Sequence, residues 1–131
     1  MYMIKLTRGL EEYLEVLYKL KLKGKKVFRI SEIARMTNVS MASVSSAIKR
    51  LHELGMVKYE RYGYVELTKA GEKYAKKMYE SEILIFKFLH EILGVSKNVA
   101  LEDACKIEHD LSNETLEKLE KFIRKILGGN K

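Results

Sequence analysis

The stretch SEIARMTNVSMASVSSAIKRLHELGMV, residues 31–57, decides the fold that we expect for this chain of 131 residues. Ser31 can cap a helix that runs to about Met36, and residues 37–39 then form a turn. Ser40 can cap a second helix, and Gly55 stands where that helix would end. The apolar side chains of the second helix recur on one face and are Val44, Ala47, Ile48, Leu51 and Leu54. This pattern predicts a helix-turn-helix.

An alternating stretch follows the second helix and predicts a β-hairpin. Val57 and Tyr59 precede an expected turn at about 61–63, and Val65 and Leu67 follow it. A helix-turn-helix that is followed by a hairpin is typical of a winged helix. The second helix of such a unit can lie in the major groove of DNA.

Helices are also expected on both sides of this unit, at about 8–23, 68–94, 99–110 and 113–127. The long helix at 68–94, which Thr68 can cap, is apolar nearly all round between Ile83 and Leu89. Such a helix is buried on several sides, often against another subunit. We therefore expect a mostly α-helical protein with a small β-hairpin wing.

Composition narrows the class of protein. Apolar residues make up 47% of the chain, and the single cysteine excludes an internal disulfide framework and fits a reducing cytoplasm. No apolar run approaches the roughly 20 residues that a membrane span needs. Residues 1–80 hold 17 Lys or Arg against 9 Asp or Glu, whereas residues 81–131 hold 8 against 9. This basic excess favours a polyanionic partner for residues 1–80. The alternative is that these lysines only form the lysine-rich surface of a heat-adapted protein.

The start of the second helix carries short side chains that suit close approach to base edges and thymine methyls. Basic side chains lie one turn later and at the expected wing tip, where they suit phosphates. The expected DNA-binding residues are Arg29, Ser40, Ala42, Ser43, Ser45, Ser46, Lys49, Arg50, Arg61 and Tyr62. The alternative is a winged helix that docks proteins and whose serines only cap the helix.

A second set of residues has spacings that DNA binding does not need. Glu12 and Glu15 lie three apart on the first expected helix, and Cys105, Glu108 and His109 lie at i, i+3 and i+4 on a later one. Thiolate, carboxylate and imidazole together suit a divalent transition metal better than Mg²⁺ or Ca²⁺. The ordinary alternative is a small core cysteine with solvated glutamates.

Three stretches of the chain carry a resemblance: EEYLEVLY at 11–18, the residues from Ile30 to the LTKAG string that ends at Gly71, and EDACKIEHDLS at 102–112. Together they resemble the iron- and manganese-dependent repressors of the diphtheria toxin repressor and manganese transport regulator family, over about residues 6–127. The resemblance implies a winged helix-turn-helix DNA-binding domain at 1–70. It also implies a helical metal-binding and dimerisation domain at 71–131, without the SH3-like domain of longer members.

The resemblance also implies a metal site, with the ligands Glu12, Glu15, Glu82, Cys105, Glu108 and His109. Glu82 stands where the family usually has a histidine. The implied cofactor is a divalent transition metal, Mn²⁺ or Fe²⁺ in the first place, with Zn²⁺, Co²⁺ and Ni²⁺ as further candidates. No ancillary metal site is expected, because Leu101 stands where members with that site have a histidine.

The resulting hypothesis is a cytoplasmic, homodimeric, metal-dependent transcriptional repressor of iron or manganese homeostasis. It would bind an inverted-repeat operator in double-stranded DNA and would not be an enzyme. Its core and two-fold interface would use the apolar belt of Ile83–Leu93, Val99, Leu111, Leu116 and Leu119. One alternative is a winged-helix regulator that responds to a non-metal effector or to none. A second alternative is a metal-dependent hydrolase. It is disfavoured because the sequence holds no glycine-rich phosphate motif.

Overall fold

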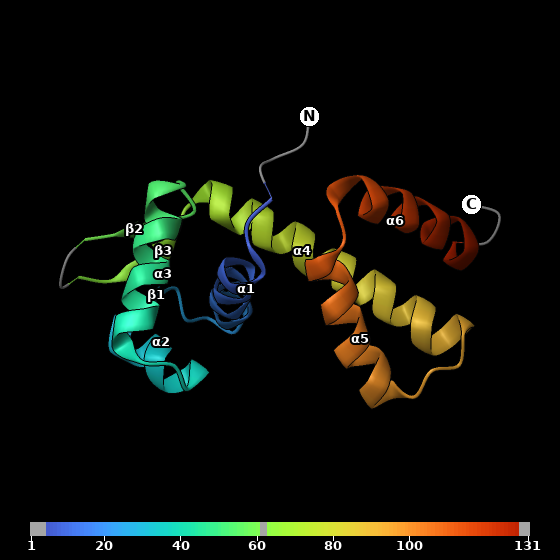
Figure 1. The fold of residues 1–131 in the computed structure, drawn as a ribbon, viewed down its shortest axis with the longest axis horizontal. Helices are drawn as coiled ribbons and strands as arrows, with labels where there is room; N and C mark the ends of the chain where they lie inside the picture. Colours follow the sequence, from blue (N-terminus) through green and yellow to red (C-terminus); the bar gives the residue numbers. More distant parts are fainter. Residues whose placement is uncertain (1–4, 61–62, 129–131) are drawn as a thin grey trace. The chain divides into compact units, whose positions relative to one another are not determined.

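The computed structural model describes residues 5–60 and 63–128 (Figure 1). Its elements are α1 (Arg8–Leu22), β1 (Val27–Phe28), α2 (Ile30–Thr37), α3 (Met41–Glu53), β2 (Val57–Tyr59), β3 (Val65–Leu67), α4 (Lys69–Lys87), η1 (Phe88–Ile92), α5 (Lys97–Asp110) and α6 (Asn113–Leu127). Backbone contacts divide the chain into two compact units: one is Gly9–Lys76, and the other comprises the described residues on either side of it. Within the described residues, no helix has the length and apolar character of a membrane span.

The unit Gly9–Lys76 contains the predicted helix-turn-helix. Asn38 takes the left-handed conformation, with φ 56°, at the end of α2, and asparagine tolerates this region better than most residues. The Oγ of Ser40 accepts a hydrogen bond of 3.2 Å from the backbone N–H of Ser43, so the predicted cap of α3 is confirmed. Gly55, with φ 78°, follows the end of α3 as predicted.

The expected cap of α2 at Ser31 is wrong, because α2 begins one residue earlier, at Ile30. Arg29 is the N-cap residue, and its backbone N–H donates a hydrogen bond of 2.9 Å to the carboxylate of Glu32. This is half of a capping box, in which a glutamate inside the first turn reaches back to the N-cap. The start of α2 is therefore fixed by a carboxylate rather than by a serine hydroxyl.

The predicted hairpin forms, and β1 adds a third strand to it. The strand order is β1-β3-β2, and both pairings are antiparallel. Val65 lies opposite Tyr59 in the hairpin and opposite Phe28 in the added pair. The fully buried side chains of the strands and helices in this unit include Leu14, Leu17, Phe28, Ile33, Val44, Ile48, Leu51 and Val65. The apolar face predicted for α3 thus belongs to the core of the winged helix.

Thr68 and Gly71 close the base of the wing at the start of α4. The Thr68 hydroxyl donates to the carbonyl oxygen of Gly55 at 2.6 Å and accepts from the backbone N–H of Gly71 at 3.0 Å. The backbone N–H of Thr68 donates to the carbonyl oxygen of Met56 at 3.1 Å. Gly71 approaches this carbonyl so closely that a Cβ would collide with it. These contacts give Thr68 and Gly71 of the LTKAG string their physical roles.

The other unit is helical. The helix predicted to run without a break to about Gly94 is α-helical only to Lys87 and continues as one turn of π-helix, η1. The core of the unit joins α4, α5 and α6 and consists of Ile85, Ala104, Leu116 and Ile123. A buried hydrogen bond of 2.7 Å from the Ser81 hydroxyl to the Glu120 carboxylate also links α4 to α6.

The predicted apolar belt divides between the core and the surface of this unit. Ile85 and Leu116 are buried, and six half-buried members pack against them: Leu84, Phe86, Phe88, Leu89, Leu111 and Leu119. Four other members are exposed, namely Ile83, Ile92, Leu93 and Val99. Part of the belt therefore builds the unit, and the rest is left on its surface.

Replacing Gly71 by alanine should lower the free energy of unfolding by about 1–3 kcal/mol, because the new Cβ pushes α4 away from the carbonyl of Met56. Gly9→Ala is the matched control, because Gly9 is also helical and a Cβ there meets no described atom within 4 Å. Urea unfolding followed by circular dichroism measures both variants. Equal stability of the two would contradict the close approach at Gly71.

Candidate metal centre and DNA-binding surface

Three of the predicted metal ligands converge inside the helical unit: Glu82 on α4, with Cys105 and His109 on α5. A carboxylate oxygen of Glu82, the Sγ of Cys105 and a ring nitrogen of His109 all lie within 4.8 Å of one another. Cys105 and His109 are four residues apart and so share one face of α5. His109 is buried and the other two are half-buried. Packing of α4 with α5 therefore brings together residues that are far apart in the sequence.

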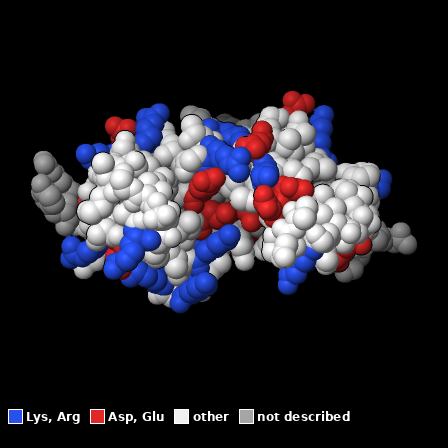
Figure 2. Space-filling model, turned by 60° about the horizontal axis from the view of Figure 1, so that its bottom comes forward, with Lys and Arg blue, Asp and Glu red and all other residues white. Residues whose placement is uncertain are grey.

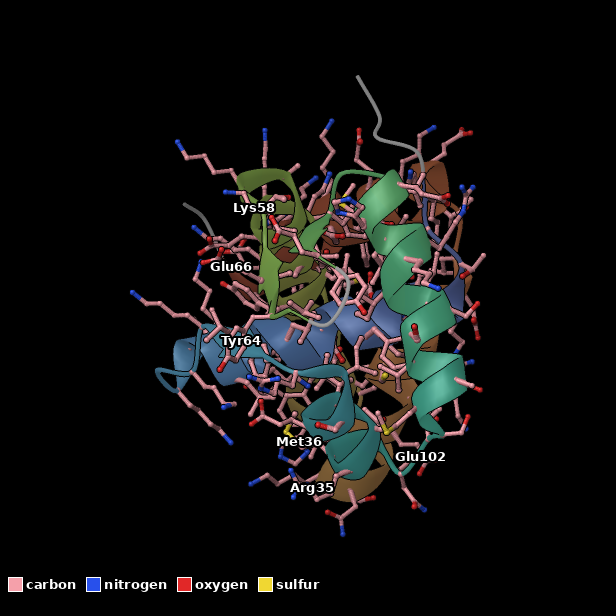
Figure 3. The ribbon with its side chains drawn as sticks, turned by 90° about the vertical axis from the view of Figure 1, so that its left-hand side faces the viewer. Arg35, Met36, Lys58, Tyr64, Glu66 and Glu102 are labelled. Atoms are coloured by element: carbon pink, nitrogen blue, oxygen red, sulfur yellow. The ribbon has the colours of Figure 1, made fainter. Side chains whose placement is uncertain are left out.

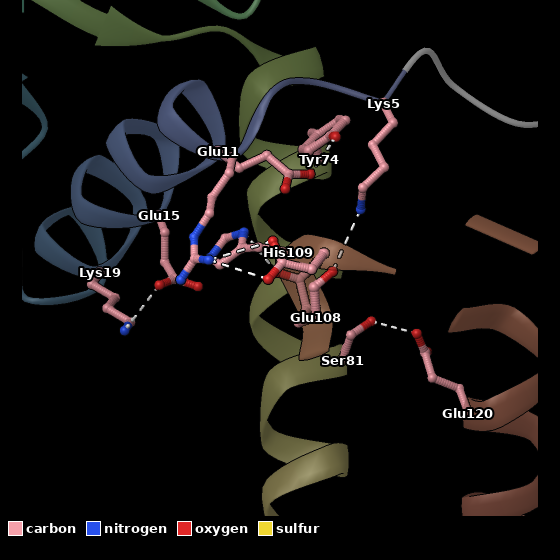
Figure 4. A network of polar contacts seen from close by, with 11 residues as sticks. Lys5, Glu11, Glu15, Lys19, Tyr74, Ser81, Glu108, His109 and Glu120 are labelled. Carbon is pink, nitrogen blue, oxygen red and sulfur yellow. Dashed lines mark hydrogen bonds and ion pairs between the residues drawn. The ribbon is translucent and has the colours of Figure 1, made fainter. Parts of the chain in front are cut away.

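Glu108 lies beside this group. Its Oε1 is 3.1 Å from the Nδ1 of His109, and both side chains are buried (Figure 4). The Nζ of Lys5 donates to the main-chain oxygen of Glu108 at 3.4 Å. A carboxylate that binds one ring nitrogen fixes the orientation of the imidazole. This arrangement is common for histidines in metal sites.

The predicted ligands on α1 belong to the unit Gly9–Lys76 and differ in burial. Glu15 is buried, with its Oε1 3.4 Å from the Nζ of Lys19, whereas Glu12 is exposed. Glu11, which is not among the predicted ligands, is buried and accepts a hydrogen bond of 2.6 Å from the Tyr74 hydroxyl (Figure 4). Glu11 and Glu15 are in phase with the buried apolar positions of α1, so the helical periodicity itself contained this signal.

The donor types of the helical unit fit a divalent transition metal. Imidazole and thiolate are the softer protein ligands, and carboxylate oxygen is a hard one. A set that mixes them suits ions such as Fe²⁺, Co²⁺ and Zn²⁺ better than Mg²⁺ or Ca²⁺. The side chains stand on two helices that share a core, so their spacing is set by packing rather than by a loop.

The predicted DNA-reading end of α3 is open to solvent. Its exposed members are Ser40, Ala42, Ser43, Ser46, Lys49 and Arg50, and Ser45 is half-buried. The guanidinium of Arg50 lies 3.4 Å from the carboxylate of Glu53. The predicted contacts Arg61 and Tyr62 lie outside the described residues. In Figure 2, lysine and arginine side chains gather along the lower edge of the unit Gly9–Lys76, at the left of the view.

Arg29, another predicted DNA contact, connects the start of α2 to the wing. Its guanidinium lies over the ring of Tyr64, 4.6 Å from the ring centre, and donates a hydrogen bond of 3.2 Å to the Tyr64 hydroxyl. Figure 3 shows Tyr64 on the wing together with Lys58 and Glu66, which lie opposite each other on β2 and β3. The wing is thus tied to α2 as well as to its own strands.

A winged helix followed by a helical unit that clusters carboxylate, thiol and imidazole groups is the arrangement expected of a metal-responsive DNA-binding protein. Comparison with known families agrees with this. The protein-family model described as "Iron dependent repressor, N-terminal DNA binding domain" matches residues 5–65. A second family model, described as "Iron dependent repressor, metal binding and dimerisation domain", matches residues 68–127. The chain therefore belongs to the iron-dependent repressor family, and the predicted family and fold class are confirmed.

Individual relatives support the assignment. The chain is 38% identical over 120 residues to an uncharacterised HTH-type transcriptional regulator of Methanocaldococcus jannaschii, covering 92% of this chain and 96% of the relative. It is 30% identical over 118 residues to the HTH-type transcriptional regulator MntR of Lysinibacillus sphaericus, covering 90% and 84%. The solved structure of the manganese regulator SloR matches with a TM-score of 0.69 and 30% identity, covering 88% of this chain and 53% of SloR.

These findings confirm the predicted function at the level of a metal-dependent, DNA-binding transcriptional repressor with a divalent transition metal as its cofactor. Its partners are DNA and a second copy of the chain. The individual metal ligands and DNA contacts remain predictions from the sequence.

The pKa of Glu32 should lie below the usual range for glutamate, because the backbone N–H of Arg29 and the ammonium of Lys25 both favour the carboxylate. Since the folded-state pKa is depressed, this cap stabilises α2 at neutral pH and is lost as the pH falls through that value. An NMR titration of the Glu32 carboxyl carbon measures it. Lys25→Ala should raise the pKa, and the control Lys26→Ala should leave it unchanged; equal values in both variants would contradict the role of Lys25.

Proposed function

We propose that the chain represses genes of iron or manganese homeostasis, acting in the cytoplasm as a homodimer that binds an inverted-repeat operator when its metal is bound. The observation that carries this proposal is the convergence of Glu82, Cys105 and His109 in a member of the iron-dependent repressor family. The description of SloR as a manganese regulator supports manganese beside iron. Because the relatives are named as transcriptional regulators, we infer that the metal serves regulation here and not catalysis.

The proposed division of labour follows the sequence: residues 1–70 bind DNA, and residues 71–131 hold the metal and form the dimer. The exposed apolar side chains of the helical unit support the second role, because such surfaces mark interfaces. They include Ile83, Ile92, Leu93 and Val99 of the predicted belt, and also Leu101, Phe122 and Ile126. A two-fold axis would present two copies of α3 to DNA. An inverted repeat is expected because the two-fold axis of the dimer relates the two half-sites. These half-sites would lie about one helical turn of DNA, roughly 34 Å, or a multiple of it apart.

The proposed ligands are Glu12, Glu15, Glu82, Cys105, Glu108 and His109. A divalent cation supplies positive charge that offsets the repulsion among their carboxylates. Because α1 is part of the DNA-binding unit, ligands on α1 would make the placement of the winged helix depend on metal. The coupling between metal and DNA affinity in such systems is about 1–3 kcal/mol, and DNA should tighten metal binding by the same factor.

The donor set also supports a choice among metals. The thiolate of Cys105 favours Zn²⁺, Co²⁺ and Fe²⁺, whereas an oxygen-rich set that includes Glu82 favours Mn²⁺ and Fe²⁺. Fe²⁺ is the ion that is favoured both by a thiolate ligand and by an oxygen-rich ligand set. The metal that acts in a cell also depends on availability, since affinity order alone does not set selectivity.

Cys105→Ser and Glu108→Gln should each lower metal affinity by about 10–100-fold, because each removes a donor or the group that orients one. The metal-dependent gain in DNA affinity should shrink with it. Glu102→Gln is the matched control on α5, since its exposed carboxylate lies 3.2 Å from Lys106. The measurement is a gel shift on the DNA upstream of the gene, with Mn²⁺, Fe²⁺, Zn²⁺ and a chelator compared side by side.

Two results of this gel shift would change the proposal. Operator affinity that chelation leaves unaltered would contradict the metal switch and would favour a constitutive regulator or one with a non-metal effector. Loss of the metal response in Glu11→Gln, with no loss in Glu12→Gln, would replace Glu12 by its buried neighbour in the ligand set.

Lys49→Ala should weaken DNA binding about equally for all sequences and should reduce the slope of log affinity against log salt by about one, because it would remove one phosphate contact. Lys118→Ala, which removes an exposed lysine of α6, is the control. Fluorescence anisotropy over a range of salt concentrations gives both slopes. A slope that Lys49→Ala leaves unchanged would exclude Lys49 from the phosphate contacts.

A further inference from the structure

A hollow in the surface of the unit Gly9–Lys76 lies where α3 begins, beside the start of α2 and strand β2. Its volume is about 450 Å³, and its lining includes Arg29, Ile30, Met41, Ala42, Ser45 and Tyr59. Three of these residues are predicted DNA contacts, but Met41 is not among them. The hollow therefore places an unassigned side chain within the proposed DNA-binding surface.

Met41 is a large apolar residue at a polar, exposed end of a helix. It is the first residue of α3, between Ser40 and Ala42, and 56% of its surface is exposed. With so little of it buried, stability of the winged helix gives no reason for a methionine at this position. Its unbranched, polarisable side chain adapts well to a small apolar partner.

Arg29, which carries a cation, also lines the hollow. The guanidinium of Arg29 is held over the ring of Tyr64 and hydrogen-bonded to its hydroxyl, so its position is set before any ligand arrives. An apolar wall with a fixed guanidinium suits a ligand that combines a small apolar group with a phosphate. A thymidine nucleotide in duplex DNA is such a ligand, because the C5-methyl of thymine lies in the major groove and no other base has one.

Resting on the proposed function, we propose that Met41 is a specificity-determining residue that contacts the C5-methyl group of a thymine, while Arg29 neutralises a neighbouring phosphate. Uracil differs from thymine only in lacking this methyl group. Replacing one thymidine by deoxyuridine therefore removes the partner of Met41 and leaves base pairing and phosphates unchanged. Loss of one buried methyl should lower affinity about fourfold.

The experiment uses the full chain with Mn²⁺ and the tightest duplex that it selects from a random DNA pool. Each thymidine of one half-site is replaced in turn by deoxyuridine, and affinity is measured by fluorescence anisotropy. The wild type should lose about fourfold at one position. Met41→Ala should bind the parent duplex about as weakly as the wild type binds the deoxyuridine duplex, and should lose nothing further at that position.

Met36→Ala is the matched control, because Met36 is also an exposed methionine of this unit, at 44%, but lies on α2 (Figure 3). It should keep the wild-type deoxyuridine profile, and urea unfolding should show both variants folded. The proposal is overturned if no thymidine position matters to the wild type, or if Met41→Ala retains the wild-type profile. Failure to select any duplex would instead contradict the proposed function, and the role of Met41 with it.

Discussion

The close approach of Glu82, Cys105 and His109 is the constraint on which the helical unit depends. Three ionisable side chains within 4.8 Å of one another in partly buried surroundings are costly to keep unless opposite charge or hydrogen bonds offset them. The apolar core of Ile85, Ala104, Leu116 and Ile123 joins the helices that carry them, so packing fixes the ligand spacing. The spacing of these candidate ligands is thus a consequence of how α4 meets α5.

The winged helix depends on a comparable joint at the base of the wing. Thr68 bonds the carbonyl oxygen of Gly55, just past the end of α3, and the backbone of Gly71 in the first turn of α4. One hydroxyl group thereby ties the end of α3 to the start of α4. Gly71 is needed because only a residue without Cβ fits against the carbonyl of Met56. The carboxyl end of α3 is therefore held by the base of the wing, and its amino-terminal end, which holds the predicted DNA contacts, is exposed.

Arg29 links the start of α2 to the wing. Its backbone N–H is bound by Glu32 at the start of α2, and its side chain rests on Tyr64 of the wing. A guanidinium that is already placed loses less conformational freedom on binding than a free one. The same residue lines the hollow beside Met41. Helix capping, wing attachment and the proposed phosphate contact thus meet at one position in the chain.

The features that the sequence determined by itself are local ones, which depend on residues only a few positions apart in the chain. The caps at Ser40 and Thr68, the turn glycine at Gly55 and the shared face of Cys105 and His109 follow from helical geometry, which is local. Only the tertiary structure decided that β1 joins the sheet, that Arg29 and Glu32 start α2, and that Glu11 is buried while Glu12 is exposed. It also brought Glu82 close to Cys105 and His109 on α5. These features depend on which faces of distant elements pack together, and that is settled by the burial of apolar surface across the whole unit rather than by neighbouring residues.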